Sequence, residues 1–293
     1  MNAPDRSASE LLPPELLDRL ASLDLVARTI VRGFISGAHR SPFLGSGEDF
    51  ARHRAYQQGD DVRRLDWRLY GRTDRLYLRL FEETSNLQAM IVVDASASMG
   101  FQGSGSVSKL RYAQFVAAAL AHIMLWSGDA TGLASFAGET TAGETTFHLP
   151  PRNRPGQLHD LLLPLSRLEP AGSGSTARAL SEVGSALRRR GRVILLSDCL
   201  TDDEGEELLG AVSLLRARGD EVIVLRISTE DELGISPPDA ARYYDPETPG
   251  RTIDAVPSDD PGFRDRVAAY YDGLRLGLEE RGAEFVPLTT STP

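Results

Sequence analysis

The chain has one cysteine, Cys199, and no long apolar run in its 293 residues. A single cysteine excludes an internal disulfide bond and fits a reducing compartment. No stretch approaches the roughly 20 consecutive apolar residues that a helix needs to span a bilayer. The N-terminus also has no apolar signal core. We therefore expect a cytoplasmic protein that does not insert directly into a membrane.

The sequence motifs of several common enzyme classes are missing as well. There is no Gly-x-x-x-x-Gly-Lys-Ser/Thr phosphate loop and no Gly-x-Ser-x-Gly nucleophile elbow. The five histidines fall in no catalytic or metal-binding spacing. Cys199 follows Asp198, whose charge disfavours a thiolate, so we expect an unreactive thiol. We predict a non-enzymatic role, with a divalent-metal-dependent hydrolase as the alternative.

Charge is unevenly distributed along the chain. The net charge of -10 disfavours binding to phosphate-rich partners such as nucleic acids and anionic membranes. Between positions 52 and 79, however, eight arginines are interleaved with aromatic residues and aspartates. Three roles fit these arginines: ion pairs with the aspartates, a protein-docking face, or stacking on single-stranded nucleic acid. We favour ion pairs and expect no nucleic-acid partner, and we keep a nucleic-acid-binding protein that uses this segment as a further alternative.

Oxygen-bearing side chains follow two apolar stretches that are predicted to be buried strands, residues 90–93 and 193–197. An Asp-x-Ser-x-Ser turn follows the first strand and an aspartate follows the second. A threonine opens a predicted helix after the glycine-rich segment 172–175. Open parallel sheets bind ligands outside the carboxyl ends of their strands. The candidate metal ligands at this edge are Asp94, Ser96, Ser98, Thr176 and Asp198.

Carboxylate and hydroxyl oxygens are the ligands that hard cations prefer, so we expect Mg²⁺ or Mn²⁺ as the cofactor. If the two strands are neighbours, Asp94 and Asp198 repel each other without a cation between them. Ordinary structural roles also exist for these residues. Asp94 and Ser96 fit turn or helix caps, Thr176 fits a helix N-cap, and Asp198 fits a turn former. The occurrence of all three contexts in this order favours the metal site.

Strand and helix patterns alternate along the rest of the chain. This alternation predicts an α/β fold, a doubly wound, mostly parallel sheet flanked by helices. The further predicted strands are residues 130–136, 145–149 at an edge, 222–227 and 284–287. The predicted helices are residues 109–126, 156–168, 176–190 with a basic last turn at Arg188, Arg189 and Arg190, 203–218, and 261–281.

Three other segments complete the predicted organisation. Residues 13–37 form an amphipathic helix that packs against the core. Residues 76–81 form an edge strand that leads into the central strand, and residues 242–244 and 252–254 form a hairpin. We divide the chain into an N-terminal helical segment (1–38), an Arg- and aromatic-rich segment with an edge strand (39–85) and an α/β domain (86–290).

The five candidate ligands, in their order and structural contexts, resemble the metal-ion-dependent adhesion site of von Willebrand factor A domains. This resemblance implies a von Willebrand A-like fold for the α/β domain. It also implies that the bound cation keeps an outward position, which an acidic side chain from a client protein completes.

The upstream segment resembles the signature of a narrower family, the domain of unknown function 58. The resemblance is carried by Arg40-Ser41, by residues 45–50, by Arg54-Ala55-Tyr56, by residues 59–63 and by Asp66-Trp67. Members of this family have a von Willebrand A-like core and are typically encoded beside MoxR-type AAA+ ATPases. The resemblance implies a metal-dependent protein-protein interaction module, an adaptor or partner of such an ATPase in the assembly or maturation of protein complexes. The candidate docking residues are Arg54, Tyr56, Asp60, Asp61, Arg63, Asp66 and Trp67.

Overall fold

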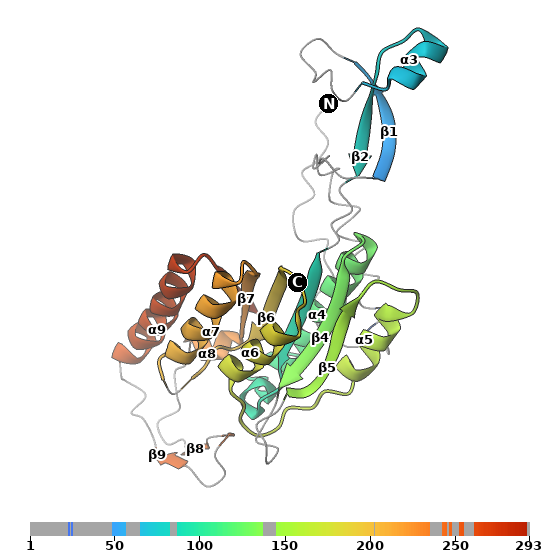
Figure 1. Ribbon diagram of the computed structural model, residues 1–293. Helices are drawn as coiled ribbons and strands as arrows, with labels where there is room; N and C mark the ends of the chain where they lie inside the picture. The colour runs from blue at the N-terminus through green and yellow to red at the C-terminus, as the bar shows by residue number, and fades with distance from the viewer. Residues whose placement is uncertain are drawn as a thin grey trace, which may run out of the picture.

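The computed structural model describes residues 23, 25, 49–56, 65–82, 87–136, 145–201, 203–234, 242–244, 246–247, 252–254 and 261–291. A six-stranded sheet forms its centre, with the strand order β10-β7-β6-β3-β4-β5 (Figure 1). The strands are β3 (Gln88–Asp94), β4 (Ala130–Phe136), β5 (Thr145–Arg152), β6 (Gly191–Ser197), β7 (Glu221–Ser228) and β10 (Glu284–Thr289). All neighbouring strands are parallel except β5, which is antiparallel to β4 at the edge. The predicted doubly wound α/β sheet is confirmed.

The central strand β3 is buried on both faces of the sheet. Successive side chains of a strand point to opposite faces, so a strand covered on both sides reads as a continuous apolar run. Ile91 and Val93 lie in one hydrophobic cluster, whereas Met90 and Val92 lie in another. All four side chains are fully buried. The sheet therefore separates two hydrophobic cores.

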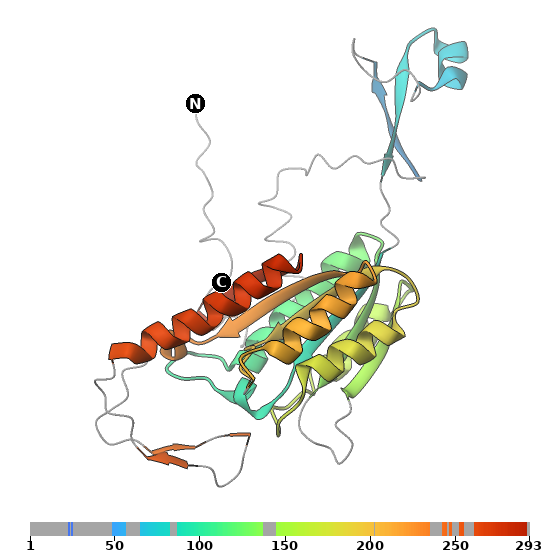
Figure 2. The same ribbon diagram turned by 60° about the vertical axis from the view of Figure 1, so that its left-hand side comes forward.

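Helices cover both faces of the sheet (Figure 2). They are α4 (Lys109–Trp126), α5 (Gln157–Leu165), α6 (Thr176–Ala186), α7 (Glu206–Ala217), the short α8 (Glu230–Gly234) and α9 (Pro261–Glu280). Residues of α4 and α5 pack in the core that contains Ile91 and Val93. Residues of α6, α7 and α9 pack in the core that contains Met90 and Val92.

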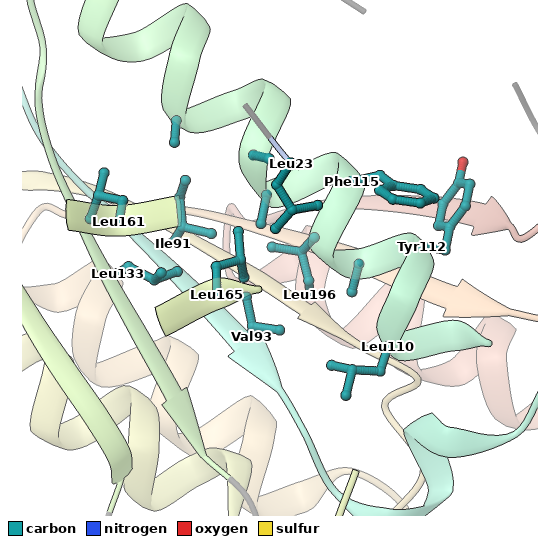
Figure 3. Packing of buried hydrophobic residues seen from close by; sticks show 14 of the residues in the cluster. Leu23, Ile91, Val93, Leu110, Tyr112, Phe115, Leu133, Leu161, Leu165 and Leu196 are labelled. Atoms are coloured by element: carbon teal, nitrogen blue, oxygen red, sulfur yellow. The ribbon is translucent and has the colours of Figure 1, made fainter. Parts of the chain in front are cut away.

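Part of the predicted N-terminal helix packs against the α4 side of the sheet. Leu23 and Leu25 are both helical. Leu23 is 4% exposed and belongs to the same cluster as Ile91 and Leu196 (Figure 3). Leu25 is 49% exposed, and this contrast is typical of an amphipathic helix. The rest of the predicted helix, residues 13–37, lies outside the described residues.

The predicted edge strand at residues 76–81 exists, and the structure shows which strand it pairs with. It is β2 (Tyr77–Glu82), and it pairs with β1 (Asp49–Ala55) in a separate two-stranded antiparallel sheet instead of extending the six-stranded sheet. A local pattern of side chains predicts a strand, but it does not predict which strand becomes its partner. The helix α3 (Trp67–Thr73) lies between β1 and β2 in the chain.

The predicted basic last turn of the helix at 176–190 is wrong. α6 ends at Ala186, so Arg188–Arg190 lie beyond the helix. Leu187 has an extended backbone and is 4% exposed in the core on the α6 side. Because the backbone is already extended at Leu187, the arginines do not occupy the last turn, where a positive charge interacts best with the helix dipole.

Two smaller elements complete the described chain. β8 (Arg242–Tyr244) and β9 (Thr252–Asp254) pair in antiparallel fashion, which confirms the predicted hairpin. The 3-10 helix η3 (Ala97–Gly100) follows β3. Within the described ranges, no helix is both long enough and apolar enough to cross a membrane.

Candidate metal centre

The two strands that carry the predicted acidic ligands, β3 and β6, are parallel neighbours, so the condition for repulsion between Asp94 and Asp198 is met (Figure 1). The chain continues from β3 to β4 on one side of this pair, and from β6 to β7 and β10 on the other side. In open α/β sheets, ligands bind outside the carboxyl ends of the strands where the order reverses in this way. Asp94 is the last residue of β3, and Asp198 directly follows β6. Both carboxylates therefore lie at the reversal point of the sheet.

Asp94 is held by groups from both strands. Asp94 is buried, with an exposed fraction of only 4%. One carboxylate oxygen, Oδ1, accepts the backbone N–H of Ser96 at 2.9 Å, and Oδ2 accepts the hydroxyl of Ser197 at 2.6 Å. The hydroxyl oxygens of Ser96 and Ser98 lie 3.0 Å apart. The turn after β3 therefore gathers a carboxylate and two hydroxyls.

The segment before α6 brings Thr176 to the same place. The backbone N–H of Ala97 donates to Gly172 O at 2.7 Å, and that of Ala171 donates to Ala95 O at 3.0 Å. These bonds fix the glycine-rich segment beside the turn that follows β3. Thr176, the first residue of α6, lines the same cleft as Ser98.

The structural roles that the sequence allowed as alternatives, helix caps and turns, have different outcomes at Thr176, Ser96 and Asp198. Ser175, not Thr176, is the N-cap of α6, and its hydroxyl accepts the N–H of Arg178. Ser96 is the N-cap of η3, but its side chain makes no capping hydrogen bond. The alternative that Thr176 is an N-cap is therefore wrong. Asp198 does form a turn, because its Oδ1 accepts the N–H of Leu200 at 3.1 Å.

A lysine that sequence reasoning missed completes this cluster. Lys109 is 0% exposed, and its ammonium lies 2.8 Å from Oδ2 of Asp198 and 2.5 Å from Oε1 of Glu232. It is the first residue of α4, where the helix dipole disfavours a positive charge. The signal that could have found it is its rarity: the chain has 32 lysines and arginines, and Lys109 is the only lysine among them.

The electrostatics of the centre are dominated by buried negative charge. Burial and the charge of Asp198 raise the pKa of Asp94 to about 7, and the hydrogen bonds from Ser197 and Ser96 offset only part of this rise. Burial, followed by the charges of Asp198 and Asp94, also raises the pKa of the Cys199 thiol. This agrees with the expected unreactive thiol. Asp94 thus lies beside a second buried carboxylate, and the hydrogen bonds that it accepts do not compensate for this position.

The residues at this edge fit a hard divalent cation. The predicted donors are two carboxylates and three hydroxyls, and all five belong to turns or termini at the carboxyl ends of β3 and β6. In the part of the chain that the structure describes, no group of three or more His, Cys, Asp or Glu is placed to hold a metal. A site here therefore depends on hydroxyl ligands, which suit Mg²⁺ or Mn²⁺ better than zinc.

An open cleft with a volume of about 740 Å³ begins at these ligands and reaches α9. Its walls include Ser98 and Thr176 as well as Tyr270 and Tyr271 of α9. The two tyrosines fix α9 to the segment after β6, because their hydroxyls donate to the backbone oxygens of Cys199 and Asp198. Leu200, also on the cleft wall, is 51% exposed. Polar ligands and an apolar contact surface thus lie side by side.

The candidate docking residues are only partly described. Asp60, Asp61 and Arg63 lie outside the described residues, and Arg54 is placed as part of β1. Tyr56, which follows β1, is half-buried, and its backbone N–H donates to Leu76 O at 3.0 Å.

Asp66 and Trp67 differ from each other. Asp66 is 7% exposed, and its Oδ1 accepts the N–H of Leu69 at the start of α3, which is a structural role. Trp67 is 63% exposed and packs edge-to-face against Tyr70 with ring centroids 6.3 Å apart. Trp67 is thus available on the surface, whereas Asp66 is not.

The chain has relatives among curated proteins. They include the uncharacterized protein Rv1480 of Mycobacterium tuberculosis (strain ATCC 25618 / H37Rv) and the uncharacterized protein Mb1516 of Mycobacterium bovis (strain ATCC BAA-935 / AF2122/97). Each is 31% identical over 203 residues, which are 68% of this chain and 62% of the relative. The chain therefore spans less than two thirds of the length of these relatives.

Solved structures with similar chain paths include the conserved hypothetical protein BatB from Bacteroides thetaiotaomicron, at 16% identity and a TM-score of 0.45. That match covers 69% of this chain and 90% of the other. A von Willebrand factor type A protein from Catenulispora acidiphila matches at 18% identity and a TM-score of 0.34, over 52% of this chain and 35% of the other. These TM-scores are too low to establish a common fold by themselves.

The family follows from the sequence. The mostly parallel sheet flanked by helices agrees with the von Willebrand A-like fold that the motifs implied. A family model described as "Protein of unknown function DUF58" matches residues 52–272, which is most of the chain. The chain therefore belongs to the DUF58 family.

Proposed function

We propose that this chain is a metal-dependent protein-protein interaction module that acts as an adaptor or partner of a MoxR-type AAA+ ATPase in the assembly or maturation of protein complexes. The observation that carries the proposal is that the buried carboxylates Asp94 and Asp198 follow two neighbouring parallel strands. The hydroxyls of Ser96 and Ser98 lie in the turn after the first strand, and Ser98 and Thr176 line an open cleft. When bound, Mg²⁺ or Mn²⁺ supplies a coordination position that an acidic side chain of a client protein completes.

The cleft supports a binding role for this edge. Leu200 offers an exposed apolar side chain, while its backbone N–H is held by Asp198. A partner that places a carboxylate on the cation can therefore place an apolar group on Leu200. The hydrogen bonds of Tyr270 and Tyr271 to the segment after β6 hold α9 against this part of the cleft wall. Preformed walls reduce the ordering cost of binding.

The segment around α3 supports a second contact, with the ATPase. Trp67 and Tyr70 are exposed by 63% and 39% and lie against each other. Tryptophan and tyrosine are enriched among the residues that dominate binding energy at protein interfaces. We assign the client protein to the metal edge and the ATPase to this aromatic pair.

Calorimetric titration with Mg²⁺ and Mn²⁺ tests the metal centre. We expect one ion per wild-type chain and no binding to Asp94→Ala or Asp198→Ala, each checked for folding by circular dichroism. Glu280→Ala is the matched control, because Glu280 is exposed and ends α9 next to the amino end of β10, at the opposite edge of the sheet. Retention of the ion by both site variants contradicts the metal assignment.

A pull-down with a MoxR-type AAA+ ATPase from the same organism tests the adaptor role. The wild-type chain is expected to retain the ATPase, and Asp94→Ala is expected to retain it equally, because the aromatic pair is unchanged. Absence of the ATPase from the wild-type pull-down contradicts the adaptor role, whatever the outcome of the metal titration.

A further inference from the structure

Lys109 is the least ordinary charged residue of the described chain. Lysine is rarely fully buried unless it is paired, yet Lys109 is 0% exposed. Its ammonium contacts two carboxylates, those of Asp198 and Glu232, at 2.8 and 2.5 Å. It is also the only lysine in a chain whose other basic residues are all arginines.

The carboxylate that Lys109 contacts is one of the two predicted metal ligands. In this structure both oxygens of Asp198 are engaged, Oδ2 by Lys109 and Oδ1 by the N–H of Leu200. Asp94, in contrast, is bonded by a hydroxyl and an N–H, and it makes no ion pair with any residue that the structure describes. A cation that binds Asp198 through Oδ2 therefore has to displace the ammonium.

Glu232 gives the displaced ammonium a place to remain. Its Oε1 accepts from Lys109, while its Oε2 accepts the N–H of Thr229 at 2.8 Å. Asp231, the residue before Glu232, also holds α8 in place, because its carboxylate accepts hydrogen bonds from the N–H and hydroxyl of Ser104. Lys109 can thus give up Asp198 without losing its second ion pair.

Whether the ion pair with Asp198 can be exchanged depends on whether the basic residue is a lysine or an arginine. An ammonium is a compact point charge with three donors on a flexible stem, whereas a guanidinium binds carboxylates as a rigid fork. Arg226, the other buried cation nearby, stacks on the ring of Tyr271 at 4.2 Å. Arg226 forms no ion pair with Asp94 or Asp198 in the described part of the chain. Lysine is therefore the residue suited to an exchangeable pairing.

We propose that Lys109 is the resident cation of this site: it holds Asp198 in the metal-free chain and yields it to a divalent cation, while remaining paired with Glu232. Lys109 is a positioning residue that lowers the affinity of the site for its metal and links occupancy of the site to α8. This inference rests on the proposed function, since it concerns regulation of the same metal site.

Magnesium titration of three full-length chains tests the competition. Lys109→Met removes the competing charge and is expected to tighten Mg²⁺ binding on the order of tenfold or more, because a unit charge at ion-pair distance from a ligand is lost. Glu232→Gln is expected to weaken binding, because the ammonium then has only the carboxylate of Asp198. If Lys109 is only a structural strut, both variants lose affinity, and that result overturns the proposal. An unchanged affinity in Lys109→Met overturns it too.

A second readout follows the lysine directly in the wild-type chain. With only one lysine, protein labelled with ¹³C at the lysine ε carbon gives a single ε-methylene signal in a nuclear magnetic resonance spectrum. Mg²⁺ is expected to shift this signal in the wild type and leave it in place in Asp94→Ala. This measurement and Glu232→Gln both retain Lys109, so they decide the question even if Lys109→Met does not fold.

The outcomes separate this inference from the proposed function. Mg²⁺ binding by the wild type with an unmoved lysine signal overturns the inference and leaves the metal-dependent module standing. Binding by Lys109→Met alone means that the lysine does not yield Asp198 in the wild type, so it overturns the exchange and also contradicts metal dependence of the wild-type chain. Absence of Mg²⁺ and Mn²⁺ binding in both chains overturns both proposals.

Discussion

The carboxyl edge of the six-stranded sheet and the β1-β2 segment with α3 use polar and aromatic residues in opposite ways. At the sheet edge, the charged groups of Asp94, Asp198 and Lys109 are buried. In the other segment, the rings of Trp67 and Tyr70 are exposed. Buried charges cost free energy unless they are paired, whereas exposed aromatic pairs are suited to a partner protein. The difference supports the proposed division between a metal site and a docking surface.

If the six-stranded sheet and its helices provide most of the stability of the chain, truncation of a core side chain there should give the largest loss in the free energy of unfolding. Leu180, in α6, is fully buried in the core with Met90 and Val92. We expect Leu180→Ala to lower the free energy of unfolding by about 2 to 5 kcal/mol, because it removes buried apolar surface and leaves a cavity. Urea unfolding measures the loss. Leu214→Ala, the same substitution at a residue that is 66% exposed, is the control, and equal losses in both contradict this assignment.

A smaller effect is expected at Asp203, on the cleft wall. Its carboxylate accepts the N–H groups of Glu207 and Gly205 at the start of α7, at 2.7 and 3.2 Å. Loss of such a cap costs about 1 kcal/mol. We therefore expect Asp203→Ala to destabilise the chain by about 1 kcal/mol near neutral pH, whereas Asp203→Asn keeps an acceptor and loses less.

The contribution of Asp203 is expected to depend on pH in a defined direction. The N–H of Glu207, followed by the hydroxyl of Thr201, lowers the pKa of Asp203 below its ordinary value of 3.8. A carboxyl whose pKa is lower in the folded state stabilises the fold above its unfolded pKa, and this contribution disappears as the pH falls through the folded value. The gap between wild type and Asp203→Ala should therefore close in acid, as urea titrations at several pH values can show. A gap that widens in acid contradicts this cause.

The smallest effect on stability is expected at Trp67, and this residue gives the clearest test of the comparison between the buried sheet edge and the exposed aromatic pair. Because Trp67 is 63% exposed, Trp67→Ala should change the free energy of unfolding by less than about 0.5 kcal/mol. It should nevertheless reduce retention of the ATPase in a pull-down, since the aromatic pair with Tyr70 is lost. Trp126→Ala is the matched control, because Trp126 is 70% exposed at the end of α4. Equal retention by the two variants excludes the aromatic pair as the docking surface.

Local patterns predicted much of the sheet body. The helix at 109–126 and the strand at 130–136 have the predicted bounds. The helix begins after the Ser108 cap, and Gly128 has a positive φ just beyond its end. Residues next to the helix therefore determine both of its ends. Asp94 and Asp198 lie at the same edge of the sheet, because β3 and β6 are parallel neighbours, whereas the full set of five ligands stays a prediction. Their metal occupancy stays a prediction.

The rest of the centre depends on contacts that a linear pattern does not contain. A lysine at the start of a helix is expected to face solvent, and burial of Lys109 appears only when α4, β6 and α8 are packed together. In the sequence, Ser197 is simply the last residue of a predicted strand. Its hydrogen bond to Asp94 becomes evident only when β3 and β6 are known to be neighbours. The pairing of β2 with β1 was missed for the same reason, because strand propensity does not specify the partner.

The hydrogen bonds of the centre join distant parts of the polypeptide. Asp94 and Ser197 are 103 positions apart, and Lys109 and Glu232 are 123 positions apart. During synthesis the N-terminal portion leaves the ribosome first, so the centre cannot close until residues beyond 232 have emerged and docked. The client of the proposed interaction is therefore expected to meet only chains whose translation has passed that point. The edge thus forms only on chains long enough to include β3, β6 and α8.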